Sequence, residues 1–270
     1  MMRFGPQTLN PKMKPLFTAH NIILDSGEQT NSEIPDIEKD NWFISARDLL
    51  KALLPGPASQ YRIADLACLE GGFTVGFARL GYQAVGIEVR DSNIAACRYV
   101  KERVNLENLE FIQDDVWNLA RHGEFDAIFC RGLLYHFDAP RAFVNLMSSV
   151  TKKVLICQTH FSNDEPEQIE KYRLSSPAIN EEAQGRWYTE FLDQASWEQN
   201  RDAARWSSWD NQRSFFPKRE YILQWIHDAG FNFVLEQFGP GNIVDAIQQG
   251  YYKVHGRGTF VGVKAAQQQT

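Results

Sequence analysis

The feature that most constrains the fold of this chain is a run of apolar strand-like segments that alternate with helix-like segments. Five such strands are predicted: RIADLAC, AVGIEV, LEFIQDDV, FDAIFCRG and KKVLICQTHF, at residues 62–68, 84–89, 109–116, 125–132 and 152–161. Because parallel strands are buried on both faces, they read as nearly continuous apolar runs, and the intervening helices cover the sheet. The alternation predicts an α/β fold with a mostly parallel sheet and helices on both faces.

Residue types at the ends of the helical patterns agree with this prediction. Gly81 follows the second helical pattern, in the position that ends many helices. Asp91 or Ser92 is expected to cap the third helix, and Asp138 the fourth, which carries Pro140 in its first turn. After residue 217 one more helix and two more strands are predicted, at 218–230, 231–238 and 258–265.

The alternation stops between residues 162 and 217, which suggests an insertion in the sheet domain. This stretch is polar, yet it holds four of the seven tryptophans of the chain. A disordered linker would be poor in aromatic residues, so we expect an ordered cap over the sheet edge. The predicted division is an N-terminal extension or lid at 1–45, a core at 46–161 and 218–265, and a substrate cap insertion at 162–217.

Composition limits the classes of function. The chain has 270 residues, 43% of them hydrophobic, and a formal net charge of -6, which disfavours a nucleic-acid surface. Its start lacks the apolar stretch of a signal peptide, and no apolar run approaches the ~20 residues of a membrane span. We therefore expect a cytoplasmic protein without a membrane partner. The four cysteines form no CxxC pair, so free buried thiols are expected and no metal site is predicted.

The turn after the first strand, Leu69-Glu70-Gly71-Gly72-Phe73, indicates the kind of ligand. Ligands of open parallel sheets bind beyond the carboxyl ends of the strands, near such a turn. The spacing does not match the GxGxxG pattern that binds a pyrophosphate, and a carboxylate at Glu70 would repel phosphates. A ligand with positive charge and no phosphate, such as S-adenosylmethionine, fits the turn better.

Acidic residues at successive strand ends match the parts of that ligand in order. Asp65 is placed to contact the ammonium group, Glu88 the ribose hydroxyls, and Asp115 the adenine amino group, with Val116 beside the base. Each carboxylate also has a plainer interpretation. Asp65 would cap the following turn, Asp115 the segment after it, and Glu88 would only be solvated.

Two glycines complete the predicted contact with the amino-acid part of the ligand. Gly71 and Gly72 are expected to let the backbone approach the methionine portion, where a Cβ would intrude.

The segment DLACLEG, residues 65–71, resembles the first motif of class I S-adenosylmethionine-dependent methyltransferases. Usual members carry glycine where this chain has Ala67 and Leu69. The segment RGLLYHFDAP is similar to GVLYH of the tRNA wobble-uridine carboxymethyltransferases, and residues 208–231 resemble bacterial small-molecule methyltransferases. The resemblance implies a Rossmann-like, seven-stranded sheet with an antiparallel last strand. We also assign Ala67 and Arg131 to the cofactor site.

In this architecture the residues after the fourth strand face the transferred methyl group. Tyr135 and His136 are therefore the first catalytic candidates, with His136 as the base for a hydroxyl or amine acceptor. His160, at the end of the fifth strand, is a second candidate. The alternative for His136 is a hydrogen bond to a neighbouring loop, and a carboxylate acceptor would need no base.

The acceptor is predicted to lie against the aromatic insertion. Trp187, Trp206 and Trp209 would bury flat or apolar groups, Arg213 would pair an acidic group, and His20 would enter from the N-terminal lid. We expect a small-molecule or peptide-like acceptor, with a place in secondary metabolism. Two alternatives remain open: a tRNA-modifying transferase, and a catalytically silent adenosylmethionine-binding module.

Overall fold

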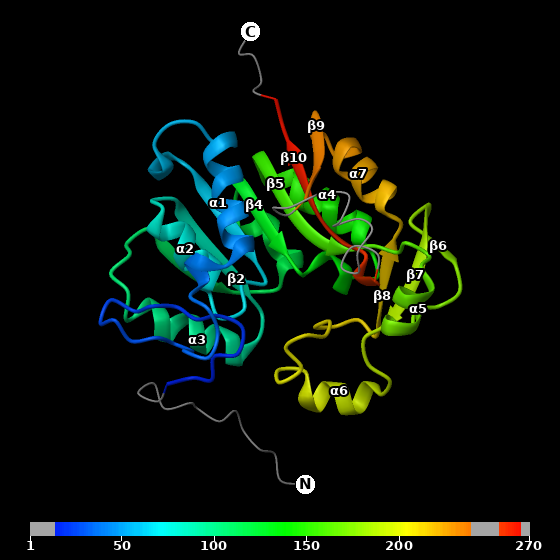
Figure 1. Ribbon diagram of the computed structural model, residues 1–270, viewed down its shortest axis with the longest axis horizontal. Coiled ribbons are helices and arrows are strands. Elements are labelled where there is room, and N and C mark those ends of the chain that lie inside the picture. The colour runs from blue at the N-terminus through cyan, green and yellow to red at the C-terminus, as the bar shows by residue number, and fades with distance from the viewer. Residues whose placement is uncertain (1–13, 239–253, 266–270) are drawn as a thin grey trace.

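A computed structural model describes residues 14–238 and 254–265 and places a seven-stranded sheet at the centre of the molecule (Figure 1). The strand order is β3-β2-β1-β4-β5-β10-β9, and β10 runs antiparallel to β5 and β9. The bounds are β1 (Arg62–Leu66), β2 (Gln83–Glu88), β3 (Leu109–Gln113), β4 (Phe125–Arg131), β5 (Thr151–His160), β9 (Phe233–Gln237) and β10 (Arg257–Val263). The first five strands are parallel, so the predicted fold class is confirmed.

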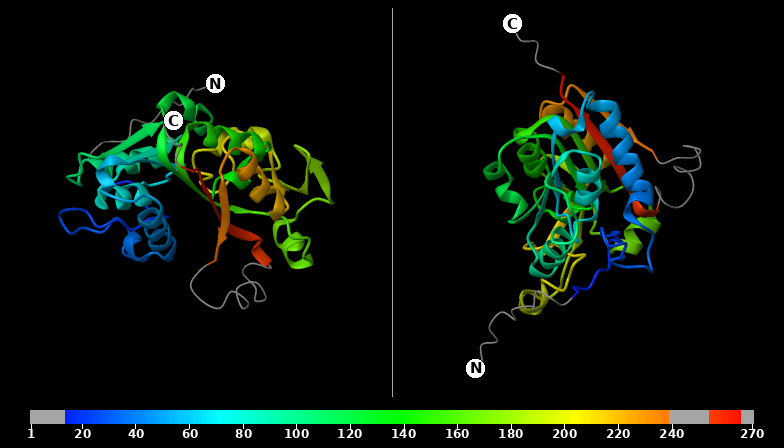
Figure 2. Two further views of the ribbon diagram at one scale, coloured as in Figure 1. Left: turned by 90° about the horizontal axis from the view of Figure 1, so that it is seen from above. Right: turned by 90° about the vertical axis from the view of Figure 1, so that its left-hand side faces the viewer.

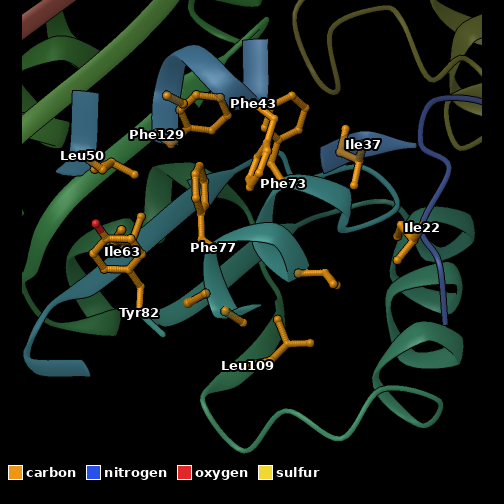
Figure 3. Packing of buried hydrophobic residues seen from close by; sticks show 14 of the residues in the cluster. Ile22, Ile37, Phe43, Leu50, Ile63, Phe73, Phe77, Tyr82, Leu109 and Phe129 are labelled. Carbon is orange, nitrogen blue, oxygen red and sulfur yellow. The ribbon is translucent and has the colours of Figure 1, made fainter. Parts of the chain in front are cut away.

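Helices cover both faces of this sheet, as Figure 2 shows for α1 and α4 on opposite sides. One face packs against α1 (Asn41–Leu53), α2 (Gly72–Arg79) and α3 (Asp91–Lys101), and the other against α4 (Pro140–Val150) and α7 (Arg219–Asp228). Figure 3 shows the first face, where Phe43, Phe77 and Phe129 meet between α1, α2 and β4. These apolar contacts hold the turn between β1 and α2 in place.

Two of the predicted helix caps are wrong. The N-cap residues of α3 and α4 are Arg90 and Ala139, whose own side chains make no cap bond. Distant carboxylates cap these helices instead: Asp202 accepts from Ser92 N–H at 3.2 Å, and Glu181 accepts from the N–H groups of Arg141 and Ala142. Asp91 is instead the first residue of α3. Gly81 does follow α2 with a φ of +97°, in the left-handed region that a C-terminal cap requires.

The four cysteines are buried and free, as the sequence predicted. None of the helices in the described ranges is long and apolar enough to cross a membrane. Residues 1–13, 239–253 and 266–270 lie outside the described residues, so the structure describes the predicted N-terminal extension only from residue 14.

Residues 162–217, hereafter the insertion, form a small antiparallel sheet beside the main one (Figure 1). Its elements are α5 (Pro166–Tyr172), β6 (Ala178–Asn180), β7 (Ala183–Thr189), α6 (Gln194–Asn200) and β8 (Arg213–Pro217). The strand order is β6-β7-β8. Trp197 of α6 is buried and stacks on Phe191, so an ordered aromatic segment is present.

Candidate active site

The turn between β1 and α2 has a left-handed backbone at several positions, including two where usual family members carry glycine and this chain has Ala67 and Leu69. Ala67 and Leu69 each have a φ of +51°, and Gly71 has +81°. For residues with a Cβ this left-handed conformation is unfavourable by roughly 1–2 kcal/mol. The surrounding packing therefore imposes the path, and Ala67 and Leu69 still line the cavity described below.

Glu70 does not face a ligand, and this corrects our interpretation of the turn. Its carboxylate accepts hydrogen bonds from the backbone N–H groups of Thr18, Ala19 and His20, at 2.7, 3.0 and 2.9 Å. Arg205 of the insertion donates to the same carboxylate at 2.8 Å. Glu70 thus joins three parts of the chain: the turn, the N-terminal segment 18–20 and the insertion.

The close approach that Gly71 and Gly72 allow is to protein side chains, which corrects a second expectation. A Cβ on Gly71 would lie 2.5 Å from the ring of Phe111, and one on Gly72 would lie 2.6 Å from His20. The N–H of Gly72 donates to His20 Nδ1 at 3.0 Å. Burial first and then the charge of Arg131 lower the pKa of His20 to about 3, so the ring is neutral and can accept this bond.

A cavity of about 440 Å³ lies at the carboxyl ends of β1, β2 and β4, where ligands of such sheets bind. Most of the predicted site residues line it. These are His20, Ala67, Glu88, Asp115, Val116, Arg131, Tyr135, His136, Trp206 and Trp209. The cavity walls come from the sheet, the N-terminal segment and the insertion together.

Glu88 is held by the backbone around it. Its Oε1 accepts from the N–H groups of Val89 and Arg90, both at 2.9 Å, and its Oε2 accepts from Leu69 N–H at 3.0 Å. Burial raises the pKa of this carboxyl, and those backbone bonds oppose the rise. The carboxylate is therefore fixed in the wall of the cavity at the end of β2.

Asp115 lies two residues after β3 and lines the cavity, and it also caps a short helix. Its Oδ1 accepts from Trp117 N–H at 2.9 Å at the start of the 3₁₀ helix η3 (Val116–His122). The plainer interpretation of this residue is therefore correct in part, since a capping carboxylate retains further acceptor sites.

Asp65 is buried behind the turn and is not part of the cavity wall. Its Oδ2 accepts a 2.6 Å hydrogen bond from the Thr74 hydroxyl of α2. Burial raises the pKa of Asp65 to about 7, against opposing contributions from Thr74 and Arg131. Its direct effect is to join β1 to α2.

His136 forms the polar centre of the other half of the cavity. It ends the 3₁₀ helix η4 (Leu134–His136), and its Nδ1 lies 2.8 Å from Glu190 Oε1. The side chain of Glu190 is 1% exposed and also accepts from Ser208 N–H at 2.9 Å and from the Ser214 hydroxyl at 2.5 Å. The insertion thus supplies a buried carboxylate that orients the imidazole.

Three other predicted site residues do not line the cavity. His160 is enclosed, with Nδ1 donating to the His255 carbonyl at 2.8 Å and its ring stacked on Phe216. Burial, with Arg257 nearby, lowers the pKa of His160 to about 3. Arg213 lies over the ring of Trp187, 4.1 Å from its centroid, on the small sheet of the insertion. The geometry favours packing roles for all three.

Sequence reasoning missed three residues that shape the cavity. Glu190 orients His136, and Arg257 contributes a cation at the start of β10. Arg90 lines the cavity and donates to the carbonyls of Arg201 and Ser207, the latter at 2.7 Å, which fastens the insertion to β2. Each acts through a partner distant in the chain, so no local motif marked it.

Comparisons with known proteins bear on this geometry. The model of a family described as "Methyltransferase domain" matches residues 57–212, more than half of the chain. The chain belongs to this methyltransferase family. A curated relative, "Ubiquinone biosynthesis O-methyltransferase" of Acinetobacter baumannii, is 26% identical over 93 residues. That match covers 34% of this methyltransferase and only 39% of the relative.

Solved structures share the fold of the methyltransferase. The N-terminal domain of EvdMO1 with S-adenosylhomocysteine bound is 20% identical, with a TM-score of 0.63 over 84% of this chain and 82% of that one. The 1,6-didemethyltoxoflavin-N1-methyltransferase of Burkholderia thailandensis is 14% identical, with a TM-score of 0.54 over 83% and 78%. It was solved with 1,6-didemethyltoxoflavin and S-adenosylhomocysteine bound.

The cofactor of the methyltransferase is S-adenosylmethionine, and the residues at the strand ends fit it. The buried carboxylate of Glu88 would hold the ribose hydroxyls of the cofactor, and Asp115 with Val116 lines the cavity beyond it. Ala67 and Leu69 expose the backbone of the turn to the cavity. Within residues 14–238 and 254–265, no group of three or more His, Cys, Asp or Glu side chains is placed to hold a metal ion.

Proposed function

We propose that this methyltransferase acts on a hydroxyl or amine of a small-molecule acceptor, and that His136 is its general base. The observation that carries the proposal is the 2.8 Å contact between His136 Nδ1 and the buried carboxylate of Glu190, at the wall of the cavity. A base held in this way is the element that methylation of a hydroxyl requires and that methylation of a carboxylate does not.

In this proposal each group has one task. Glu190 accepts a hydrogen bond from the protonated Nδ1 of His136. The lone pair on Nε2 is then available to take the proton from the hydroxyl or amine of the methyl acceptor. When bound, S-adenosylmethionine supplies a methyl group on a sulfonium, open to in-line displacement. Ser208 and Ser214 also donate to the Glu190 carboxylate, which fixes its position and so the orientation of the imidazole.

The size of the cavity and the relatives support a small molecule. A volume of about 440 Å³ is within the range of small-molecule sites. The curated relative is named for ubiquinone biosynthesis, and the toxoflavin enzyme was solved with its small heterocycle. A role in secondary metabolism belongs to the same proposal, and a peptide-like acceptor is its alternative, which would place the label in the peptide fraction.

We propose the predicted division of the chain as well, with the insertion and the N-terminal segment as covers of the site. Trp206 and Trp209 of the insertion line the cavity together with Thr18 and His20 of the N-terminal segment. Arg205 connects the two covers, because it donates both to Thr18 Oγ1 at 3.0 Å and to Glu70.

The test is the transfer of labelled methyl groups to cell extracts separated into small-molecule, peptide and RNA fractions. We expect label in the small-molecule fraction, with loss of label in the His136→Asn variant. Label confined to RNA would support the tRNA-modifying alternative. A protein that binds S-adenosylhomocysteine yet labels no fraction would be the silent binding module, and the proposal would be wrong.

A further inference from the structure

Arg257 places a positive charge in the cavity, and none of the carboxylates at 14–238 and 254–265 forms an ion pair with it. It begins β10 opposite His160 in the strand ladder, and its guanidinium lines the cavity wall. Nη2 donates to the Gln158 side-chain oxygen at 2.8 Å, a neutral partner. Nε is buried without a hydrogen-bond partner, and no carboxylate among the described residues lies within 4.0 Å of the group.

A second polar group converges on the same spot. A Cβ built on Gly132 would lie 3.3 Å from Arg257 Nη2 and 3.7 Å from the hydroxyl oxygen of Tyr135. The Arg257 guanidinium and the Tyr135 hydroxyl therefore lie on either side of Gly132, which has no side chain and also lines the cavity. Burial raises the pKa of Tyr135, despite the opposing charge of Arg257, so its hydroxyl remains a donor at neutral pH.

These groups have the chemistry of an anion site. A guanidinium removed from bulk water is costly unless an anion accepts its hydrogen bonds, and its planar donors match the oxygens of a carboxylate or phosphate. Building on the proposed function, we propose that Arg257 and Tyr135 bind an anionic group of the acceptor, such as a carboxylate or phosphate. The enzyme would recognise the acceptor by this anionic group, which is distinct from the atom that is methylated.

The position of the subsite favours the acceptor over the cofactor as the source of the anion. S-adenosylmethionine also carries a carboxylate, but from the sequence its amino-acid part is expected at the turn after β1. Arg257 lies instead with Tyr135, next to His136, and its guanidinium is 5.8 Å from the centroid of the Tyr135 ring. The anionic group would therefore lie beside His136, the proposed base, where the acceptor must bind.

The experiment compares two probes that differ in charge, benzoate and benzamide, with protein saturated by S-adenosylhomocysteine. Calorimetric titration should show that wild type binds benzoate roughly 10- to 100-fold more tightly than benzamide, the scale of a charge-assisted hydrogen bond. Arg257→Gln should abolish that preference, and Arg257→Lys should restore part of it. Arg98→Gln, at an exposed position of α3, is the control and should keep the preference.

Each other outcome overturns the proposal. Equal affinity of wild type for the two probes, or an unchanged benzoate preference in folded Arg257→Gln, would exclude an anion site. Affinities for S-adenosylhomocysteine and for 5′-methylthioadenosine, which lacks the amino acid, distinguish the source. If Arg257→Gln weakens only the former, the anion is the cofactor's own carboxylate. Because no turnover is measured, these results are independent of the labelling test of the proposed function.

Discussion

The two halves of the cavity are built in different ways. In the half at the ends of β1 and β2, Glu88 is held by backbone N–H groups of its own strand end and of the neighbouring turn. In the half around His136, the decisive contacts join residues far apart in the chain. His136 and Glu190 are 54 residues apart, and Glu70 and Arg205 are 135 apart.

Under the proposed function, this difference separates cofactor binding from acceptor chemistry. The first half is preorganised by strand ends and a tight turn of the sheet domain. The second half is formed jointly by the sheet domain, the insertion and the N-terminal segment, which are joined through Arg90, Arg205 and Glu190. Substitutions in the first half should therefore act on cofactor affinity, and those in the second half on turnover and on the acceptor.

The largest expected effect tests this separation at His136. His136→Asn keeps a polar side chain but removes the base, so turnover should fall roughly 10²- to 10⁴-fold. Affinity for S-adenosylhomocysteine, measured by calorimetry, should stay nearly unchanged. Glu190→Gln is the companion variant, and it should lower turnover while leaving affinity intact. A loss of cofactor affinity equal to the loss of turnover in His136→Asn would mean that His136 forms part of the cofactor site. Full activity of His136→Asn would mean that another residue is the base or that the acceptor is a carboxylate.

The second prediction concerns the pH dependence of the free energy of unfolding, which Asp65, buried behind the turn after β1, should control. Its pKa rises from an ordinary value near 3.8 to about 7 in the folded protein. The folded state therefore binds the proton more tightly than the unfolded state, and stability falls as pH increases between about 4 and about 7. Asp65→Asn lacks this titration. Its free energy of unfolding, relative to wild type, should increase across that window, by at most on the order of 4 kcal/mol.

Urea denaturation at pH 4, 6 and 8 measures this difference. A constant difference across the three pH values would show that Asp65 titrates normally in the folded protein. Thr74→Val is a useful companion, since it removes the hydroxyl that donates to Asp65 but leaves the carboxyl buried. Because the hydroxyl bond opposes the rise in the pKa of Asp65, its removal should raise that pKa further, and the loss of stability in Thr74→Val should extend to higher pH than in wild type.

The third prediction addresses the ribose contact. Glu88→Ala should weaken binding of S-adenosylmethionine by roughly 1–3 kcal/mol, the scale of hydrogen bonds to a charged group. The substitution also leaves three backbone N–H groups without their acceptor, so circular dichroism must first show a folded protein. Glu110→Ala, at an exposed position of β3, is the control. Unchanged affinity in folded Glu88→Ala would remove Glu88 from the cofactor site.

The same contrast explains which parts of the molecule could be predicted from the sequence. The strands were predictable because burial on both faces gives each a continuous apolar run, as in RIADLAC. Glu88 and Asp115 were predictable as cavity residues because parallel strands end at one edge of the sheet. The predicted helix caps at Asp91 and Asp138 are wrong, because carboxylates from distant parts of the chain, Asp202 and Glu181, accept from the first turns of the two helices.

The long-range contacts had no local signal. Glu70 has the position of a ligand-binding residue in the turn, but its oxygens are used by Thr18, Ala19 and His20. Glu190 lies in a polar stretch of the insertion, and only the folded chain brings it to His136. A charged residue whose partner is more than 50 positions away cannot be assigned from spacing, because spacing reports only on neighbours within one element.

The smallest expected effect tests the acceptor wall at Trp206 and Trp209. Trp206 is 65% exposed, whereas Trp209 lies near the guanidinium groups of Arg90 and Arg201, 5.1 and 4.2 Å from its ring centroid. Truncating either ring to alanine should raise KM for the acceptor about 2- to 10-fold, which corresponds to the 0.5–1.5 kcal/mol of an aromatic contact. Affinity for S-adenosylhomocysteine should change less.

Leu192→Ala, at a residue of the insertion that is 88% exposed and outside the cavity wall, is the matched control. Because Trp209 is anchored through Arg90 to the end of β2, its loss should affect the cofactor more than the loss of Trp206 does. If both variants bind both ligands like wild type, the two rings only pack within the insertion, and the acceptor contacts another part of the cavity.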